Sequence, residues 1–326
     1  MITWRGLSSD LLHSGGPFPP EHSGGSFPPV TLARAYAACE TLARSHYENF
    51  PVASWLLPSA MRPHVAAVYA FARIADDIAD EGTVPAGERL TKLSAWQRRL
   101  HVAIDVEQSG PPHEHDDLIV VATAHSIRTR DLPIAWFDDL ISAFAQDITT
   151  TRYASWADVF DYCRRSANPI GRLVLRIAGY RDEILDRSSD ALCTALQLTN
   201  FWQDFGRDWR AGRVYVPRDV LAACGATEDE LAAGRPGELG RAWQDALARA
   251  VAVTDEHFRR GREVCNRVRG RLRYELRATW LGGRRMLERV DEARPNLLDY
   301  RPTLGVRDVP GILWRVVRWE TSRAYN

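Results

Sequence analysis

The stretch YAFARIADDIAD, residues 69–80, places three aspartates in a run of Ala, Ile and Phe. Such a segment is expected to bury itself, yet Asp is among the side chains least often fully buried unless it is paired. Each residue of a helix turns by about 100°, which puts four polar side chains in one narrow stripe: Tyr69, Arg73, Asp76 and Asp80. Asp77 lies to one side of it. A solvated acidic face is the simplest interpretation of one such pair, but apolar residues on the remaining faces predict that the stripe is enclosed.

A second stretch, ALQLTNFWQDFGRDWRAGRVYVP at residues 195–217, repeats the arrangement. Polar side chains recur at i, i+4 and i+8, with one more on the same side: Asn200, Asp204, Asp208 and Gln197. Aromatic residues fill the other faces: Phe201, Trp202, Phe205 and Trp209. One pair of carboxylates a turn apart is a weak signal, but two such pairs, each on an apolar helix, indicate one shared site.

The chemistry of paired carboxylates narrows what such a site could do. Carboxylate oxygens suit Mg²⁺, which is typically held by one or two carboxylates together with the phosphates of a substrate. Two facing pairs between the helices of a bundle could hold Mg²⁺ ions around a diphosphate. The metal would neutralise the charge that develops as a diphosphate leaves. The aromatic residues suggest that an apolar carbocation, shielded from water, remains behind.

The composition excludes several classes of protein. The chain has 326 residues and a formal net charge of zero, from 42 basic and 42 acidic residues, which gives no electrostatic reason to expect nucleic acid as a partner. Its five cysteines have no metal-like spacing and indicate buried thiols in a reducing compartment. We find no apolar run of about 18 residues that predicts a transmembrane helix and no signal-peptide layout, and we therefore expect a cytoplasmic protein.

The periodicity of apolar residues predicts an all-α protein. Residues 1–30, rich in Gly, Pro and Ser, are interpreted as a flexible tail; residues 31–300 form one helical domain, and residues 301–326 form a C-terminal segment. Helices are predicted over ten ranges: 31–47, 62–81, 86–107, 116–130, 133–150, 155–167, 169–180, 184–211, 239–269 and 272–291. The segment 218–240 is predicted to be a loop or cap. Two glycines at 282–283, costly within a helix, indicate close helix packing.

Both acidic stretches resemble the two aspartate-rich signatures of the squalene/phytoene synthases. The resemblance extends through DYCRRSANPIGRLVL (161–175) and LRATWLGGRRML (276–287), and it covers about residues 40–290. It implies an all-α isoprenoid synthase fold, a single helical domain with a central cavity, in which prenyl diphosphates are joined head to head.

The resemblance also implies roles for individual residues, which are carried over position by position. The implied Mg²⁺ ligands are Asp76, Asp80, Asp204 and Asp208. The implied catalytic residues are Tyr69, Arg73 and Tyr162, to which the argument below adds Glu48. The candidates for binding the substrate are Gln197, Asn200, Arg207, Arg213, Tyr215, Asn168 and Phe50.

Three departures from the family pattern distinguish this chain. Where relatives commonly have a cation that helps to hold diphosphate, this chain has Glu48, within YENF. The stretch SANPIG at 166–171 replaces the Val-Ala-Gly that follows the family's Tyr-Cys. Gln203 stands where relatives often have Arg. Arg207 follows one turn later, and it either restores the missing charge or serves as a local partner, such as one for Gln203.

The combination of ENFP and SANPIG resembles the hydroxysqualene synthase branch of bacterial hopanoid and squalene pathways. It implies Mg²⁺-dependent conversion of presqualene diphosphate and water to hydroxysqualene and diphosphate, without a nicotinamide. Two alternatives stay open. One is a head-to-head prenyl transferase that uses farnesyl diphosphate and makes presqualene diphosphate, squalene or a phytoene-type product. The other is a non-catalytic family member that acts in assembly or binding.

Two further hypotheses concern regions outside the acidic stretches. Glu48 is expected either to orient the water that traps the cation, with Asn49 or Asn168 as a second contact, or to pair with Arg44. The stretch GILWRVVRWETSR at 311–323 is predicted to form an amphipathic helix that brings the chain to the inner face of a membrane, or one that packs on the domain. Its predicted apolar face consists of Ile312, Leu313, Val316 and Val317.

Overall fold

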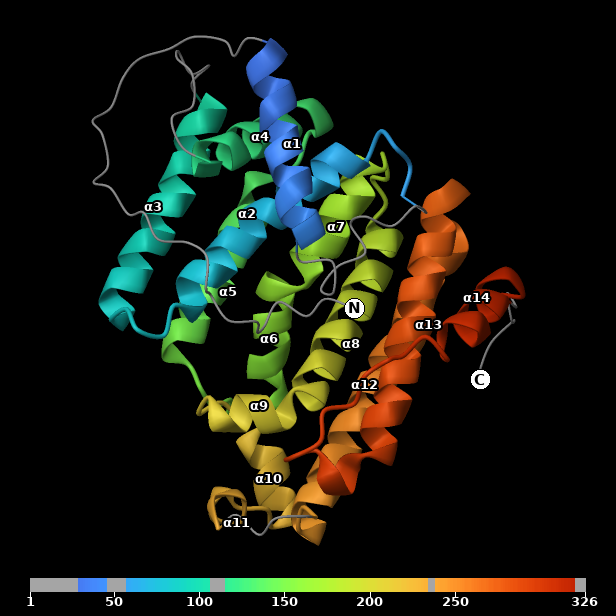
Figure 1. Cartoon of the computed structure of the whole chain (residues 1–326). Helices are drawn as coiled ribbons and strands as arrows, with labels where there is room; N and C mark the ends of the chain where they lie inside the picture. Colours follow the sequence, from blue (N-terminus) through green and yellow to red (C-terminus); the bar gives the residue numbers. More distant parts are fainter. Residues whose placement is uncertain (1–28, 46–56, 106–114, 234–237, 320–326) are drawn as a thin grey trace. The chain divides into compact units, whose positions relative to one another are not determined.

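The structure, a computed structural model, describes residues 29–45, 57–105, 115–233 and 238–319. These residues fall into two compact units, which are described separately (Figure 1). The N-terminal unit holds the described residues up to Ile148 except Leu57 and Pro58, which belong with residues 149–319 to the C-terminal unit. The prediction of a single helical domain with a central cavity stays a prediction. The predicted tail lies outside the described residues except for its last two positions, which belong to the first helix.

The N-terminal unit is built around an alanine-rich helix. Its helices are α1 (Pro29–Ser45), α2 (Arg62–Asp80), α3 (Ala86–Asp105), α4 (His115–Arg130) and α5 (Ile134–Thr149). Helix α2 packs against α1, α3 and α4, because its small side chains allow close approach. Phe71 fills the largest space on α2, with its ring centroid 5.3 Å from that of Trp96 and 5.4 Å from that of Phe137. The Trp96 indole also donates to the Phe71 carbonyl at 3.2 Å.

The C-terminal unit is centred on α8, whose C-terminal two thirds are buried almost without interruption. Its elements are α6 (Trp156–Ser166), α7 (Asn168–Ile177), α8 (Glu183–Gln203), α9 (Phe205–Arg210), α10 (Arg218–Cys224), α11 (Glu228–Ala232), α12 (Arg241–Arg267), α13 (Gly270–Glu292), η2 (Arg294–Asn296) and α14 (Val309–Val317). Helices α6, α7, α12 and α13 surround α8. The buried Trp202 indole is satisfied by the Thr254 hydroxyl at 2.8 Å.

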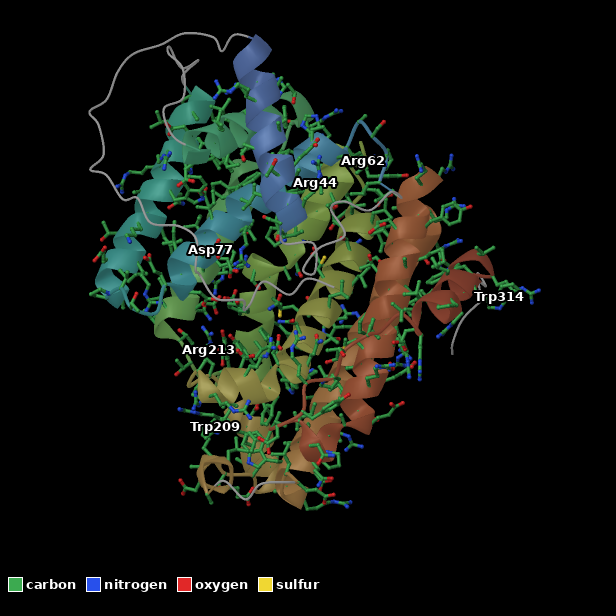
Figure 2. The ribbon with its side chains drawn as sticks, viewed as in Figure 1. Arg44, Arg62, Asp77, Trp209, Arg213 and Trp314 are labelled. Carbon is green, nitrogen blue, oxygen red and sulfur yellow. The ribbon has the colours of Figure 1, made fainter. Side chains whose placement is uncertain are left out.

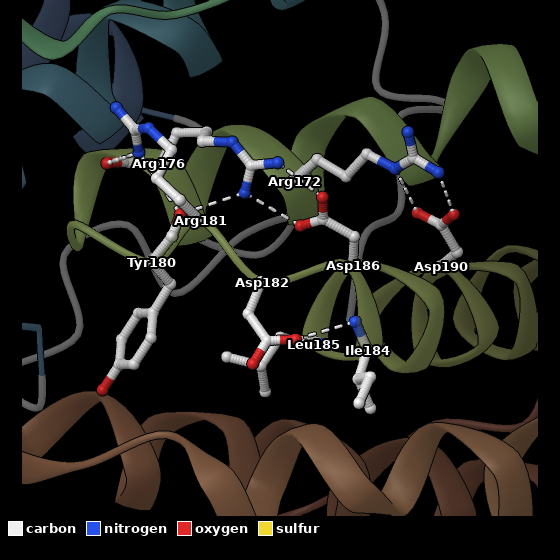
Figure 3. A network of polar contacts seen from close by, with 9 residues as sticks. All are labelled: Arg172, Arg176, Tyr180, Arg181, Asp182, Ile184, Leu185, Asp186 and Asp190. Atoms are coloured by element: carbon white, nitrogen blue, oxygen red, sulfur yellow. Dashed lines mark hydrogen bonds and ion pairs between the residues drawn. The ribbon is translucent and has the colours of Figure 1, made fainter.

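Arginine–aspartate pairs join the end of α7 to the start of α8 (Figure 3). Arg172 contacts Asp190 through two nitrogens, at 2.8 and 2.5 Å, and Arg176 contacts Asp186 at 2.9 and 2.5 Å. Asp182 caps α8 by accepting from the backbone N–H of Ile184 at 2.8 Å. These bonds fix the start of the helix that carries the second acidic stretch, since charge-assisted bidentate pairs are directional as well as strong.

Two predicted boundaries are wrong. The helix predicted over 184–211 is broken at Asp204, which has φ −93° and ψ 11°. The segment 218–240, predicted to be a loop or cap, contains the two short helices α10 and α11. Apolar periodicity indicates which face of a helix is buried. It therefore does not reveal a break, such as the one at Asp204, when the same face is buried on both sides of the break.

The close packing predicted from the glycine pair at 282–283 is confirmed for one of its members. A Cβ placed on Gly283 would lie 2.6 Å from the Leu196 side chain and 2.8 Å from Phe258, whereas one on Gly282 would meet nothing nearer than 3.9 Å. Gly283 therefore lets α13 approach α8 and α12. Among the described residues, no helix combines the length and the apolar character needed to cross a bilayer.

Candidate active site

The first acidic stretch lies on α2, where Arg73 organises the carboxylates. Arg73 Nη2 donates to Asp77 Oδ1 at 2.5 Å and Nε donates to Asp77 Oδ2 at 3.2 Å, while Nη1 lies 3.5 Å from Asp76 Oδ2. The i,i+3 and i,i+4 spacing of the helix makes these contacts possible. Tyr69, Arg73 and Asp76 are buried, as the stripe predicts, but Asp80 is exposed. The prediction that the whole stripe is enclosed is wrong at Asp80, which ends the helix.

Burial and charge act in opposite directions on the titration of this stretch. Burial raises the pKa of Tyr69 to about 12, and the neighbouring Arg73 offsets this only in part. Burial by itself would lower the pKa of Arg73, but Asp76 and Asp77 outweigh it and hold that pKa above its usual value. Tyr69 is therefore a neutral phenol and Arg73 a cation at neutral pH. Asp77, which the sequence places beside the stripe, is the carboxylate with the shortest contacts to Arg73.

The second acidic stretch brings a buried carboxylate to the junction of α8 and α9. Asp204 is 2% exposed. The helical hydrogen bonds continue across the bend, from Asp204 N to Asn200 O and from Asp208 N to Asp204 O, each at 2.9 Å. Asp204 and Asp208 therefore stay one turn apart in spite of the break. The one-turn spacing of two carboxylates, which predicts that they share a role as metal ligands, is preserved.

Arg301 neutralises Asp204. Its Nε donates to Asp204 Oδ1, and its Nη2 lies 3.4 Å from Oδ2. Arg207, one turn beyond Gln203, lies 4.0 Å from the same Oδ1 with its side chain 56% exposed. Gln203 donates instead to the Pro302 carbonyl at 2.8 Å. Arg207 thus has a local partner, as one of the two hypotheses states, but that partner is the Asp204 carboxylate three residues away and not Gln203.

The segment that carries Arg301 is fixed against α9 by its backbone. Arg210 Nη2 donates to the Leu298 carbonyl at 2.8 Å, and Gln203 holds the Pro302 carbonyl. A Cβ placed on Gly206 would lie 2.0 Å from the Leu298 oxygen, so only glycine allows this approach. The glycine in the motif QDFGRD thus makes room for the segment that supplies a cation to Asp204.

Three buried side-chain amides on α8 lack hydrogen-bond partners for their oxygens among the described residues. They are Gln197 Oε1, Asn200 Oδ1 and Gln203 Oε1, on residues that are 5%, 2% and 2% exposed. A buried polar group without a partner costs free energy, and such groups commonly mark a place where a ligand or ion binds. Gln197 and Asn200 lie seven and four residues before Asp204, so their amides lie on the same face of α8 as that carboxylate. Amide and carboxylate oxygens together fit the requirements of Mg²⁺.

Aromatic rings from the C-terminal unit cluster around Phe201 of α8. Tyr215 stacks on Phe201 with ring centroids 3.6 Å apart, Tyr162 lies 5.9 Å from Phe201, and Tyr153 lies 5.6 Å from Tyr215. All four residues are buried. Such π-faces attract a positive charge when water is excluded. The predicted residues Tyr162 and Tyr215 are brought together here, and the structure adds Tyr153, which the sequence argument missed.

The remaining predicted residues have varied environments. Asp208 is buried, and its Oδ1 lies 3.7 Å from Arg213 Nε. Asn168 accepts a hydrogen bond from the Thr194 hydroxyl at 3.0 Å, a contact that joins α7 to α8. Glu48 and Phe50 lie outside the described residues. The proposed partner of Glu48, Arg44, contacts Glu40 at 2.6 Å.

Within the described part of the chain, no group of three or more His, Cys, Asp or Glu side chains is placed to hold a metal ion. Asp76 and Asp80 lie in the N-terminal unit, and Asp204 and Asp208 lie in the C-terminal unit. The Mg²⁺ ligand set of Asp76, Asp80, Asp204 and Asp208 therefore stays a prediction. Sequence reasoning also missed Arg301, 97 positions from Asp204, and no motif near either acidic stretch points to it.

The chain is similar to known proteins of one family. The sequence pattern of the family described as squalene/phytoene synthase matches residues 43–308. A hydroxysqualene synthase of Sinorhizobium fredii is 39% identical over 189 residues, which cover 58% of this chain and 61% of that protein. The chain thus spans about three fifths of the length of the curated relatives that it matches.

Solved structures extend the similarity over more of the chain. The squalene synthase HpnC from Alicyclobacillus acidocaldarius is 38% identical, with a TM-score of 0.73 over 82% of this chain and 97% of that one. A dehydrosqualene synthase is 21% identical with a TM-score of 0.76, over 88% of this chain and 97% of that one, and it supports the isoprenoid synthase fold alone. The predicted all-α isoprenoid synthase fold is confirmed, and the chain belongs to the squalene/phytoene synthase family.

Proposed function

We propose that this chain is a hydroxysqualene synthase that converts presqualene diphosphate and water to hydroxysqualene and diphosphate. One observation carries the proposal: the buried carboxylates Asp204 and Asp208 lie one turn apart, and the amide oxygens of Gln197 and Asn200 on the preceding helix α8 have no hydrogen-bond partner among the described residues. The identity of 38–39% to hydroxysqualene synthases supports this product over others of the family. In the reaction the carbon–oxygen bond to diphosphate breaks, with its electron pair leaving on diphosphate. Water then forms a new carbon–oxygen bond and releases a proton.

The proposed reaction needs positive charge for the diphosphate. Mg²⁺, held by the four aspartates with the amide oxygens as further ligands, would neutralise the leaving group. Arg207, Arg213 and Arg301 add permanent cations around Asp204 and Asp208. Arginine suits this role because its planar fork can contact two phosphate oxygens at once.

The proposed carbocation needs an apolar environment that lacks competing nucleophiles. The cluster of Tyr153, Tyr162, Phe201 and Tyr215 presents aromatic faces from three parts of the C-terminal unit. Tyr69, a neutral phenol at physiological pH, is the corresponding candidate on α2. Glu48 remains the predicted acceptor that orients water.

Product analysis tests the proposal. Purified full-length protein is incubated with Mg²⁺ and presqualene diphosphate, without a nicotinamide, and the extracted lipid is identified by mass spectrometry. Hydroxysqualene is the expected product. Turnover of farnesyl diphosphate to presqualene diphosphate or a phytoene-type hydrocarbon, with no hydroxysqualene from presqualene diphosphate, would identify the prenyl transferase alternative. No turnover of either substrate would favour the non-catalytic alternative.

A further inference from the structure

Helix α14 presents an apolar surface that the proposed reaction does not use. Val316 is buried and Ile312 half-buried where α14 packs on α13. Leu313, Trp314 and Val317 are 53%, 58% and 75% exposed. The apolar face predicted from the sequence is therefore divided. One half attaches the helix to the C-terminal unit, and the other half is directed outward.

The outward side of α14 has an ordered pattern of apolar and basic side chains. With about 100° between successive residues, Leu313, Val317 and Trp314 span an arc of roughly 100°. Arg318 lies just beyond the Trp314 end of this arc. It stacks on the Trp314 ring, with its guanidinium carbon 4.3 Å from the ring centroid. Arg315 comes next and is exposed. Figure 2 shows Trp314 on the side of α14 away from α13. An apolar arc bordered by arginines is typical of a helix that lies in a membrane interface.

The charge of this surface is positive. Within residues 29–45, 57–105, 115–233 and 238–319, neither Arg315 nor Arg318 forms an ion pair with a carboxylate. Asp308, at the start of α14, is already engaged by Arg289 at 2.8 Å and Arg285 at 3.4 Å. The surface therefore complements an anionic partner, and its apolar arc complements an apolar one. A bilayer that contains anionic lipid offers both within the thickness of one helix.

Contacts at the end of α14 fix the orientation of this surface. The Trp319 indole donates to Asn266 Oδ1 at 2.9 Å. Its ring also contacts two guanidinium groups, with centroid distances of 4.7 Å to Arg262 and 5.1 Å to Arg277. The ring of Trp280 packs edge-on at 5.3 Å. The helix is thus held to α12 and α13, and little ordering is needed before it binds.

We propose that the outward face of α14 docks on the surface of a membrane that contains anionic lipid. Leu313, Trp314 and Val317 enter the boundary between headgroups and acyl chains, and Arg315 and Arg318 contact lipid phosphates. The docking is peripheral. It goes beyond the proposed reaction and does not depend on it, since it uses no residue of the acidic stretches.

Vesicle flotation of the full chain tests the proposal. Vesicles of phosphatidylcholine alone are compared with vesicles that also contain phosphatidylglycerol, for the wild type and three variants. The double variant Leu313→Ser/Val317→Ser removes the apolar arc, Arg315→Gln/Arg318→Gln removes the charge, and Val102→Ser, at a position 55% exposed on α3, is the matched control. Thermal unfolding verifies that each variant folds.

The expected result separates the apolar and the electrostatic contributions. The serine variant is expected to bind anionic vesicles on the order of tenfold more weakly, because binding scales with the apolar area buried. The glutamine variant is expected to lose the preference for phosphatidylglycerol and its dependence on salt, and the control is expected to bind like the wild type. Equal flotation of the wild type and the serine variant would overturn the proposal. A wild-type dimer that becomes monomeric in the serine variant, with unchanged flotation, would assign this face to a second copy instead.

Discussion

The two acidic stretches share a spacing and differ in what neutralises them. On α2, the partner of the carboxylates is Arg73, three and four residues away on the same helix, and the last aspartate, Asp80, is exposed. At the junction of α8 and α9, Asp204 is buried and its partner is Arg301, 97 positions away. The first arrangement follows from the local sequence, because both partners lie on one helix. The second exists only when the segment after η2 packs on α9.

This difference predicts different responses to mutation. A pair within one helix forms whenever the helix forms, and its exposed member keeps its contact with water. A buried carboxylate held by a distant arginine is costly when that partner is removed, because an uncompensated charge is left inside the protein.

Removing a carboxylate from either stretch tests whether both serve one site. Asp204→Asn and Asp80→Asn are each expected to lower turnover of presqualene diphosphate by at least about a hundredfold, since one electrostatic contact to a leaving group is worth roughly 3 kcal/mol. Asp105→Asn, an exposed aspartate at the end of α3, is the control and should be unaffected. Near-normal turnover of either variant at low Mg²⁺ would remove that position from the ligand set.

Removing the distant arginine tests the second arrangement. Arg301→Met is expected to lower the free energy of unfolding by about 3 kcal/mol, because Asp204 stays buried without its main partner. Arg207→Met, which removes an exposed side chain 4.0 Å from the same carboxylate, is expected to cost less than about 1 kcal/mol. Urea unfolding at neutral pH measures both. Equal losses in the two variants would show that Asp204 does not depend on Arg301.

The close approach that places Arg301 can be tested through Gly206. Gly206→Ala is expected to lower the free energy of unfolding by roughly 2 kcal/mol, since its Cβ would lie 2.0 Å from the Leu298 oxygen and overpacking of this kind costs about 1–3 kcal/mol. Gly87→Ala is the matched control. That glycine is also helical, and a Cβ there meets nothing within 4 Å, so a gain of about 0.5–1 kcal/mol is expected. An unchanged free energy of unfolding in Gly206→Ala would mean that the segment carrying Arg301 is not packed closely against Gly206.

The α2 stretch can be tested by pH. Burial raises the pKa of Tyr69 to about 12, above the ordinary value of about 10 for an unfolded chain. The neutral phenol is favoured in the folded state, so its contribution is fully present below pH 10 and is lost as pH rises from 10 to 12. At pH 11 the wild type should have lost about 1 kcal/mol through this residue. Tyr69→Phe should lack that loss, and Tyr300→Phe, at an exposed position, should behave like the wild type.

Stability measured against pH for the three proteins distinguishes the outcomes. The informative quantity is the slope between pH 10 and 12, because the substitution also removes a hydroxyl group and shifts the whole curve. Identical slopes for the wild type and Tyr69→Phe would contradict the raised pKa of Tyr69.

Local sequence patterns were enough to predict the helical class of the protein and the residues that share a turn. Helix formation and the i,i+4 spacing are local, so Asp76 with Arg73, and Asp204 with Asp208, follow from their positions along the chain. The sequence also placed Phe201 among the aromatic residues that fill the remaining faces of the second acidic stretch. The family signatures then led from these local patterns to the isoprenoid synthase fold.

Only the tertiary structure decided which partners these residues have. The pairing of Arg301 with Asp204, the approach of Leu298 to Gly206 and the aromatic neighbour Tyr153 join segments that are distant in sequence, and no local pattern encodes such contacts. Likewise, periodicity identified the apolar residues of α14 but not which of them would face α13. Burial depends on what packs against a helix, and that is a property of the whole fold and not of the helix.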